Sequence, residues 1–168
     1  MLLRLTELPD GDIPKLMAIY AEGNRENAEY FYPELPLLEG IAREEEKFVA
    51  MLRETFFPKP GNAVYVLESE EQWVAALRLT QMEDFYYLEA LETRPDQRKK
   101  GYGKALLKAV CSELSVRGAV MIRDCVYKRN QASLQTHLAA GFVIERETGI
   151  EYPGGTIDER SYGMLYRG

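Results

Sequence analysis

The spacing of hydrophobic residues along the chain predicts short strands and amphipathic helices. Leu3 and Leu5 alternate with polar neighbours, which is typical of a half-buried strand. Apolar residues then recur at helical spacing from Ile13 to Tyr20, and a second helical pattern begins at Pro36. The first of these helices is expected to fade near Asn24 to Asn27, where polar residues interrupt the pattern.

After a proline- and glycine-rich break at 58–61, the pattern changes to strands. Turns at 70–71 and 83–84 separate three strand-forming runs, which predicts an antiparallel meander. A helix then precedes the next strand, so that strand can run parallel to the last strand of the meander. The elements predicted for this half are strands near 64–66, 73–79 and 85–93, a helix from 103 to 118, a strand at 119–127, a helix at 130–141, and strands at 142–150 and 161–166.

Two clusters in the first half have more than one interpretation. The aromatic run from Tyr30 to Tyr32 is expected to pack inside the protein, with a wall of a substrate site as the alternative. The three consecutive glutamates Glu44 to Glu46 are expected to form a solvated helix face.

The most informative stretch runs from Leu88 to Lys108. A strand pattern stops at Pro95, a short basic loop carries Gly101 and Gly103, and a helix follows. This arrangement directs backbone N–H groups and the positive end of a helix dipole at one point, where an anion is stabilised. The lysines and arginine around the loop favour an anion with several charges, such as a pyrophosphate.

Two familiar phosphate-binding loops do not fit this stretch. A Walker loop requires Ser or Thr after Gly103-Lys104, and Ala105 stands there. A dinucleotide-binding loop requires a third glycine where this chain has Leu106. A plain strand-to-helix turn with solvated lysines remains the non-functional alternative.

The pattern Arg98-x-x-Gly101-x-Gly103 resembles the pyrophosphate loop of the GNAT (Gcn5-related N-acetyltransferase) family, Gln/Arg-x-x-Gly-x-Gly/Ala. Upstream, Leu91-x-Thr93-x-Pro95 stands where the family has Leu-x-Val-x-Pro. A second stretch resembles the family's Asn-x-x-Ala/Ser-x-x-x-Tyr-x-x-x-Gly-Phe. It matches at Asn130, Ser133, Gly141 and Phe142, and departs at His137, where most members have tyrosine.

This resemblance implies an α/β fold of GNAT type in a single domain over residues 1–168. The fold has a mixed, mostly antiparallel central sheet with helices on both faces. It also implies an N-acetyltransferase that moves an acetyl group from acetyl-CoA directly to a primary amine. The alternatives are a CoA-binding regulatory module without catalysis and an acyltransferase for a longer acyl-CoA. The residues expected to bind the coenzyme are Leu91, Thr93, Arg98, Lys99, Lys100, Gly101, Tyr102, Gly103, Lys104, Asn130 and Ser133.

In this interpretation the pantetheine arm adds as a strand along Leu91 to Thr93. A bulge or splay between strands 85–93 and 119–127 would open the slot, and an N–H near Leu91 would polarise the thioester carbonyl. Glu89 and Glu92 are the nearest carboxylates; three residues apart on a strand, they are expected on opposite faces, with Glu89 beside Leu91 and Thr93. Glu89 is the candidate general base.

His137 is the only histidine, and the resemblance implies that it stands at the position of the proton donor to the coenzyme thiolate. The alternative is a helix residue without a catalytic role. With one histidine and no Cys-x-x-Cys, no metal site is expected.

Composition limits the setting and the partners. The net charge is −6, yet the segment from Arg94 to Lys108 has one acid among six basic residues. The acidic remainder argues against a nucleic-acid partner and is compatible with a cationic amine acceptor, either a small molecule or a protein amine.

Two cysteines predict no disulfide framework. The chain shows no membrane-spanning run and no signal-peptide pattern, so a cytoplasmic location is expected. The resemblance leaves a homodimer as one alternative for the assembled state.

Overall fold

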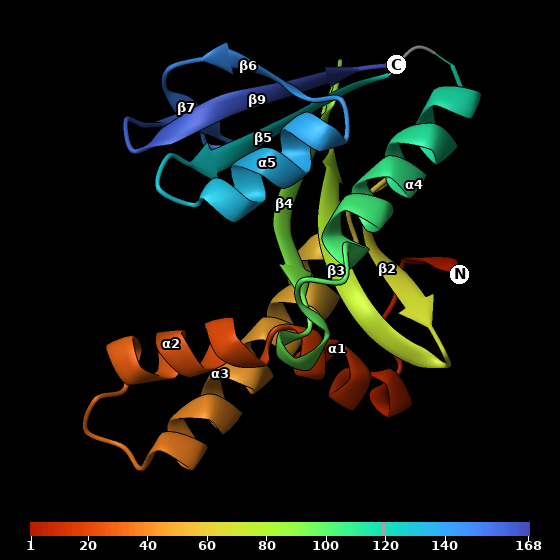
Figure 1. Ribbon diagram of the computed structural model, residues 1–168. Helices are drawn as coiled ribbons and strands as arrows, with labels where there is room; N and C mark the ends of the chain where they lie inside the picture. Colours follow the sequence, from red (N-terminus) through yellow and green to blue (C-terminus); the bar gives the residue numbers. More distant parts are fainter. Residues whose placement is uncertain (119) are drawn as a thin grey trace.

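Apolar alternation produces a mixed sheet at the centre of the molecule (Figure 1). The computed structural model describes residues 1–118 and 120–168. The strands lie in the order β1-β2-β3-β4-β5-β9-β6. Of the described strand pairs in this sheet, β4 and β5 run parallel and the others run antiparallel. The strands are β1 Leu2–Leu5, β2 Ala63–Ser69, β3 Gln72–Gln81, β4 Tyr86–Thr93, β5 Met121–Tyr127, β6 Val143–Arg146 and β9 Ser161–Arg167, and a separate hairpin pairs β7 Gly149–Glu151 with β8 Thr156–Asp158.

Helices cover both faces of this sheet, as predicted. Residues of α4 and α5 pack on one face with the apolar residues of the strands, while α1 and the turn after α3 pack on the other face. Figure 1 shows α2 and α3 as a helical pair extending away from the sheet. The helices are α1 Ile13–Ile19, α2 Ala21–Phe31, α3 Leu37–Met51, α4 Tyr102–Val116 and α5 Gln131–Ala139, with short helical turns η1 Asp10–Asp12, η2 Leu52–Phe56 and η3 Pro95–Gln97.

The helical half differs from the sequence prediction at 24–27, where the helix was expected to fade. Instead α1 ends at Ile19, and a new helix, α2, begins at Ala21 and runs through 24–27 to Phe31. Asn24 is buried and donates to Met17 Sδ at 3.6 Å. Ala28 of α2 lies close to α3: a Cβ added at Gly40 would be 3.3 Å from the Cβ of Ala28. Packing between α2 and α3 therefore stabilises a helix that local propensity did not predict.

The two ambiguous clusters also differ from expectation. Glu44 is buried at 6% exposure, so the glutamate run is not a uniformly solvated face. Tyr30 and Phe31 are 79% and 53% exposed, so these two rings are not packed in the interior. They stand at the end of α2, where the helix extends beyond the sheet.

The meander and the later helices follow the prediction closely. The strand expected at 142–150 is divided into β6 and β7, and β8 was not predicted. Ala119, the first residue of the strand expected at 119–127, lies outside the described residues. Within 1–118 and 120–168, none of the helices has the length and apolar character needed to cross a bilayer.

Candidate functional site

A bulge in β4 is the main irregularity of the central sheet. On β3, only Leu77 separates Ala76 from Arg78, whereas two residues of β4 separate their partners Glu92 and Glu89. Ala90, one of those two residues, has a left-handed backbone with φ +54°. An extra residue on one strand shifts the side-chain alternation by one position.

The bulge places Glu89 and Glu92 on the same face of the sheet, the face covered by α1 and α3. Glu89 lies opposite Arg78, whose guanidinium stacks over Phe48 of α3 at 5.5 Å, and Glu92 lies opposite Ala76 of the same core. The prediction that the two glutamates point to opposite faces was therefore wrong.

The expected neighbours of Glu89 lie on the other face. Leu91 packs against the core beneath α4, and Thr93 lies opposite Ala75 of that core. The prediction that Glu89 shares a face with Leu91 and Thr93 was wrong for the same reason: strict alternation does not survive a bulge.

β4 and β5 separate soon after they begin. Their register has two residue pairs, Tyr86 with Ile122 and Tyr87 with Arg123, although both strands continue for several residues. Parallel strands that part in this way leave backbone N–H and C=O groups without a strand partner. A splay between these two strands was predicted, and the structure has one.

The glycine loop lies at the end of the splayed strand β4. Gly101 precedes α4 with φ +82°, a conformation that favours glycine. A Cβ added at Gly103 would be 3.3 Å from Thr93 Oγ1 and 3.8 Å from Thr136 of α5. The first-turn N–H groups of α4 are therefore brought beside the end of β4, where a helix N-terminus can accept an anion.

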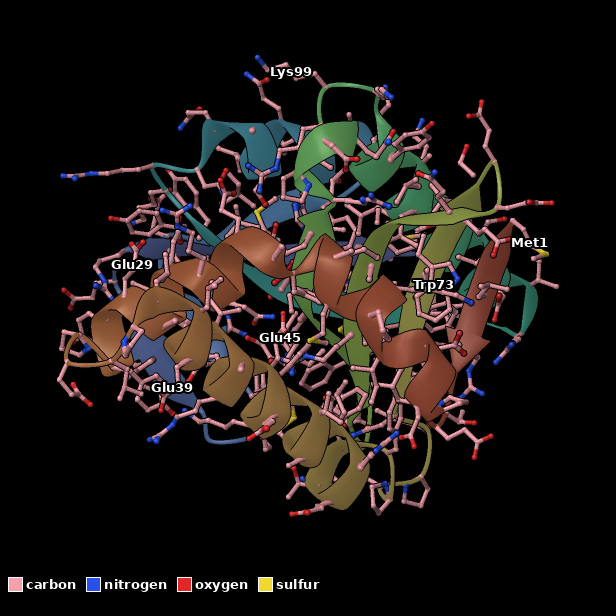
Figure 2. All side chains as sticks on the ribbon, turned by 90° about the horizontal axis from the view of Figure 1, so that it is seen from below. Met1, Glu29, Glu39, Glu45, Trp73 and Lys99 are labelled. Atoms are coloured by element: carbon pink, nitrogen blue, oxygen red, sulfur yellow. The ribbon has the colours of Figure 1, made fainter. Side chains whose placement is uncertain are left out.

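The basic side chains of the loop have different partners. Arg98 forms an ion pair with Glu22 of α2 and lies 4.0 Å from Glu92. Lys100 donates to Gln97 at 2.8 Å. Figure 2 shows Lys99 projecting from the loop at the top of the molecule, and Glu29 and Glu39 on the helical pair at the left. Positive charge thus gathers at the loop and negative charge on α2 and α3.

Tyr102 has a packing role in addition to its place in the loop. Its hydroxyl lies 3.3 Å from Ser69 Oγ at the end of β2, and its ring packs against the core beneath α4. Its side chain therefore faces β2, and the group that it can offer to an anion is its backbone N–H.

Glu89 lies partly buried beside an arginine. Burial raises the pKa of its carboxyl above the usual range, and the Arg78 guanidinium, 3.2 Å away, opposes that rise. Burial likewise raises the pKa of Glu92, with Arg98 opposing it. A raised carboxyl pKa makes the carboxylate a better proton acceptor near neutral pH.

Tyr20 contacts the bulge of β4 from the sheet face covered by α1 and α3. Its hydroxyl donates to the carbonyl oxygen of Ala90 at 2.9 Å, and its ring meets Phe48 edge-on at 5.1 Å. The sequence placed Tyr20 on an apolar helix face and gave no sign of this contact.

His137 lies in the interior, 1% exposed. Its Nδ1–H donates to the carbonyl oxygen of Ser133 at 2.8 Å, and Nε2 is 2.7 Å from Asp124 Oδ2. Burial alone would lower the pKa of His137, but the hydrogen bond and charge of Asp124 raise it above its usual range. With both nitrogens engaged inside the protein, this geometry does not support the expected donation to a thiolate.

The residues of the second motif have clear local roles. Asn130 caps α5, since its Oδ1 accepts from the Ser133 N–H at 3.0 Å. The carbonyl of Ser133 in turn fixes the His137 ring. No group of three or more potential metal ligands occurs in the part of the chain that the structure describes.

Sequence reasoning missed Tyr20, Arg78 and Asp124. Each contacts a residue of a different helix or strand. A glycine at position 90 would have indicated the bulge, but alanine stands there. The unusual histidine in the second motif was the one available sign of a buried acidic partner.

Comparison with known proteins gives an independent view of the chain. The acetyltransferase (GNAT) family model matches residues 20–142. No curated protein sequence matches the chain.

Several solved structures share the fold. One is PaiA N-acetyltransferase from Thermoplasma acidophilum in complex with coenzyme A, with TM-score 0.66 and 16% identity over 100% of this chain and 99% of that chain. Another is the ribosomal-protein-S18-alanine N-acetyltransferase from Escherichia coli, with TM-score 0.62 and 20% identity over 99% and 94%. A third is a spermidine N-acetyltransferase SpeG chimera from Vibrio cholerae and hSSAT, with TM-score 0.61 and 18% identity over 98% and 93%.

Proposed function

Because the chain belongs to the GNAT acetyltransferase family, we propose that it transfers an acetyl group from acetyl-CoA directly to a primary amine. The observation that carries the proposal is the splay of β4 from β5 beside the N-terminus of α4. A slot with free strand edges suits the amide-bearing pantetheine arm, and the helix start suits the pyrophosphate.

The residues of the loop fit the coenzyme in charge and shape. Gly101 and Gly103 keep side chains away from the start of α4, and the backbone N–H groups of Tyr102 and Lys104 belong to its first turn. Arg98, Lys99 and Lys100 add positive charge around this point. Leu91 and Thr93 offer the edge of β4, while Asn130 and Ser133 at the start of α5 are the proposed contacts from the opposite wall.

When bound, acetyl-CoA supplies the thioester carbon that the amine nitrogen attacks. The N–C bond forms, the C–S bond breaks, and the electron pair of that bond leaves with sulfur. The proton lost by the amine goes to Glu89, directly or through water, and the thiolate takes a proton from solvent. The raised pKa of the Glu89 carboxyl suits a group that accepts a proton near neutral pH.

The charge on the acceptor side supports a cationic amine. Glu89 and Glu92 share one face, and the carboxylates of Glu22 and Glu26 on α2 are near enough to act on the pKa of Glu92. The fold is shared with a spermidine N-acetyltransferase and with an enzyme that acetylates a protein alanine, so both small and protein amines enter the test.

The deciding experiment measures thioester consumption with a panel of amines. The panel contains polyamines, aminoglycosides, amino acids and peptides with a free N-terminus, and mass spectrometry identifies each acetylated product. Acetyl-, propionyl- and succinyl-CoA are compared with the best acceptor. Amine-dependent consumption with a product heavier by one acetyl group is the expected result. Coenzyme binding by calorimetry with no turnover on any amine would contradict the proposed catalysis.

A further inference from the structure

The hydroxyl of Tyr20 is bonded to the backbone of the bulge itself. It donates to Ala90 O at 2.9 Å across 70 residues of sequence, and Tyr20 is 7% exposed. Among the described strands, neither Ala90 nor Leu91 has a register partner on β3 or β5. The carbonyl oxygen of the peptide group that joins Ala90 to Leu91 is thus bonded by a side chain, at a point where β4 has no register partner.

The direction of this bond determines where the next N–H points. A trans peptide is planar, and its C=O and N–H point in opposite directions. Tyr20 lies on the α1 and α3 side of the sheet, so it draws Ala90 O to that side and turns the Leu91 N–H toward the side of α4. The glycine loop reaches the end of β4 on that same side.

We propose that Tyr20 is a positioning residue that aims and polarises the Leu91 N–H at the acetyl carbonyl of the bound coenzyme. This inference rests on the proposed acetyl transfer. Donation to the carbonyl end of a peptide strengthens the donor at its other end, because hydrogen bonds in a chain polarise one another. A fixed N–H aimed at the thioester oxygen stabilises the negative charge that develops there during attack.

The surroundings of Tyr20 keep its hydroxyl in this role. The edge-on contact with Phe48 fixes the ring. Burial raises the pKa of the phenol well above its usual range, so the hydroxyl remains a donor throughout the working pH range. The left-handed backbone of Ala90 is unfavourable for a residue with a Cβ, and the bond from Tyr20 helps to hold it.

The test is Tyr20→Phe, which removes the hydroxyl and keeps the ring. Infrared difference spectra are recorded with acetyl-CoA labelled with heavy carbon at the acetyl carbonyl. In the wild type, the bound carbonyl band is expected at lower frequency than in free acetyl-CoA. In Tyr20→Phe about half of this shift is expected to disappear, and kcat is expected to fall about tenfold, less than the loss of a direct oxyanion donor. Affinity for free CoA, which has no acetyl group, should be unchanged.

Tyr65→Phe is the matched control, because Tyr65 is also buried and its hydroxyl donates to Glu113 at 3.2 Å, away from the slot. This control should keep the wild-type carbonyl band. If Tyr20→Phe does not fold, a monofluorinated tyrosine in place of Tyr20 strengthens the donor and should lower the band further.

The possible outcomes separate the two proposals. A wild-type protein that neither binds acetyl-CoA nor acetylates any amine overturns the proposed function. A functional wild type whose carbonyl band is the same in folded Tyr20→Phe, or unchanged by the fluorinated residue, overturns the role of Tyr20 alone.

Discussion

The guanidinium of Arg78 lies 3.2 Å from Glu89 Oε1, in the middle of the sheet face covered by α1 and α3. Arg78 is held there by the rings of Phe48 and Phe56, at 5.5 and 5.9 Å. The side chains of Arg78 and Glu89 are 16% and 32% exposed, so solvent screens this pair only in part. The arginine therefore limits how far burial can raise the pKa of Glu89.

Replacing Arg78 should change the pH dependence of acetyl transfer. Arg78 lowers the pKa of Glu89 against the effect of burial, so Arg78→Met should let that pKa rise. A base works only when deprotonated, so the acid limb of the kcat/KM profile should move to higher pH. The shift is measured against the wild type with one acceptor, because the acceptor amine titrates too.

Two further variants test this interpretation of the profile. Glu89→Gln removes the proposed base, and Glu145→Gln is the matched control. Glu89→Gln should lower the plateau by roughly a hundredfold or more. Glu145 is another glutamate paired with an arginine, 3.3 Å from Arg123, and its substitution should leave the profile unchanged. An acid limb that stays in place in Arg78→Met would show that Glu89 is not the group that titrates.

Gly103→Glu should abolish coenzyme binding while the protein remains folded. A side chain at this position begins 3.3 Å from Thr93 Oγ1, between the start of α4 and the end of β4, and a carboxylate there repels phosphate. Isothermal titration with acetyl-CoA measures the loss. Gly11→Glu adds the same charge where a Cβ meets nothing within 4 Å, and it should bind like the wild type. Wild-type affinity in folded Gly103→Glu would move the coenzyme site elsewhere.

His137→Ala should act on stability more than on chemistry. Removing one partner of a buried ion pair costs about 3–5 kcal/mol of unfolding free energy, because Asp124 would be left buried without its partner. In protein that is still folded, kcat should remain within about threefold of the wild type, far less than the loss of a general acid would cause. Denaturant unfolding and kinetics below the transition temperature measure the two effects. A fall in kcat of a hundredfold in folded protein would restore the donor role.

The pH dependence of this stability effect has a definite sign. In the folded protein Asp124 raises the pKa of His137 above its ordinary value of about 6.5, so below that pH, while Asp124 is ionised, the pair stabilises the protein fully. As pH rises from 6.5 through the folded pKa, the stabilisation is lost. The difference in unfolding free energy between the wild type and His137→Ala should therefore shrink as the solution becomes alkaline.

Glu22→Gln should strengthen coenzyme binding. Arg98 is paired with Glu22, so a phosphate must compete with that carboxylate for the same guanidinium. Because the pair is solvent-exposed, the expected gain in affinity is roughly twofold to fivefold, and it should disappear at high salt. Glu29→Gln removes a carboxylate from the same helix, where it pairs with Arg25, and should have no effect. Equal affinities of Glu22→Gln and the wild type would show that Arg98 does not reach the phosphates.

The sequence predicted most of the order of elements, because periodicity is a local signal, but it did not predict the division into β6 and β7 or the strand β8. It indicated the meander, the glycine loop and the Asn130 cap, each of which depends on residues close together in the chain. The splay could be expected from the family resemblance but not from local pattern. The orientation of Glu89 could not be predicted, since one bulge without a glycine reverses it. The length of α2 depended on its packing against Gly40 of α3, which local propensity does not report.

The burial of His137 is another feature that the local sequence pattern did not predict. A histidine in the position of a family tyrosine suggested an alternative proton donor. The structure instead pairs it with Asp124, a residue of a different element that looked like an ordinary strand residue in the sequence. A substitution within a motif can thus reflect a change in the core rather than a change in chemistry.

The sheet of this protein is also two smaller sheets, β1 to β4 and β5, β9 and β6, joined along a seam of two residue pairs. Beyond the seam, the described residues of β4 and β5 have no register partner on the facing strand. In the proposed function, a ligand with amide groups would enter there as a removable strand and add hydrogen bonds between the two halves. The stability of the junction between the two halves would then rise with the concentration of such a ligand, because the ligand binds only the folded protein.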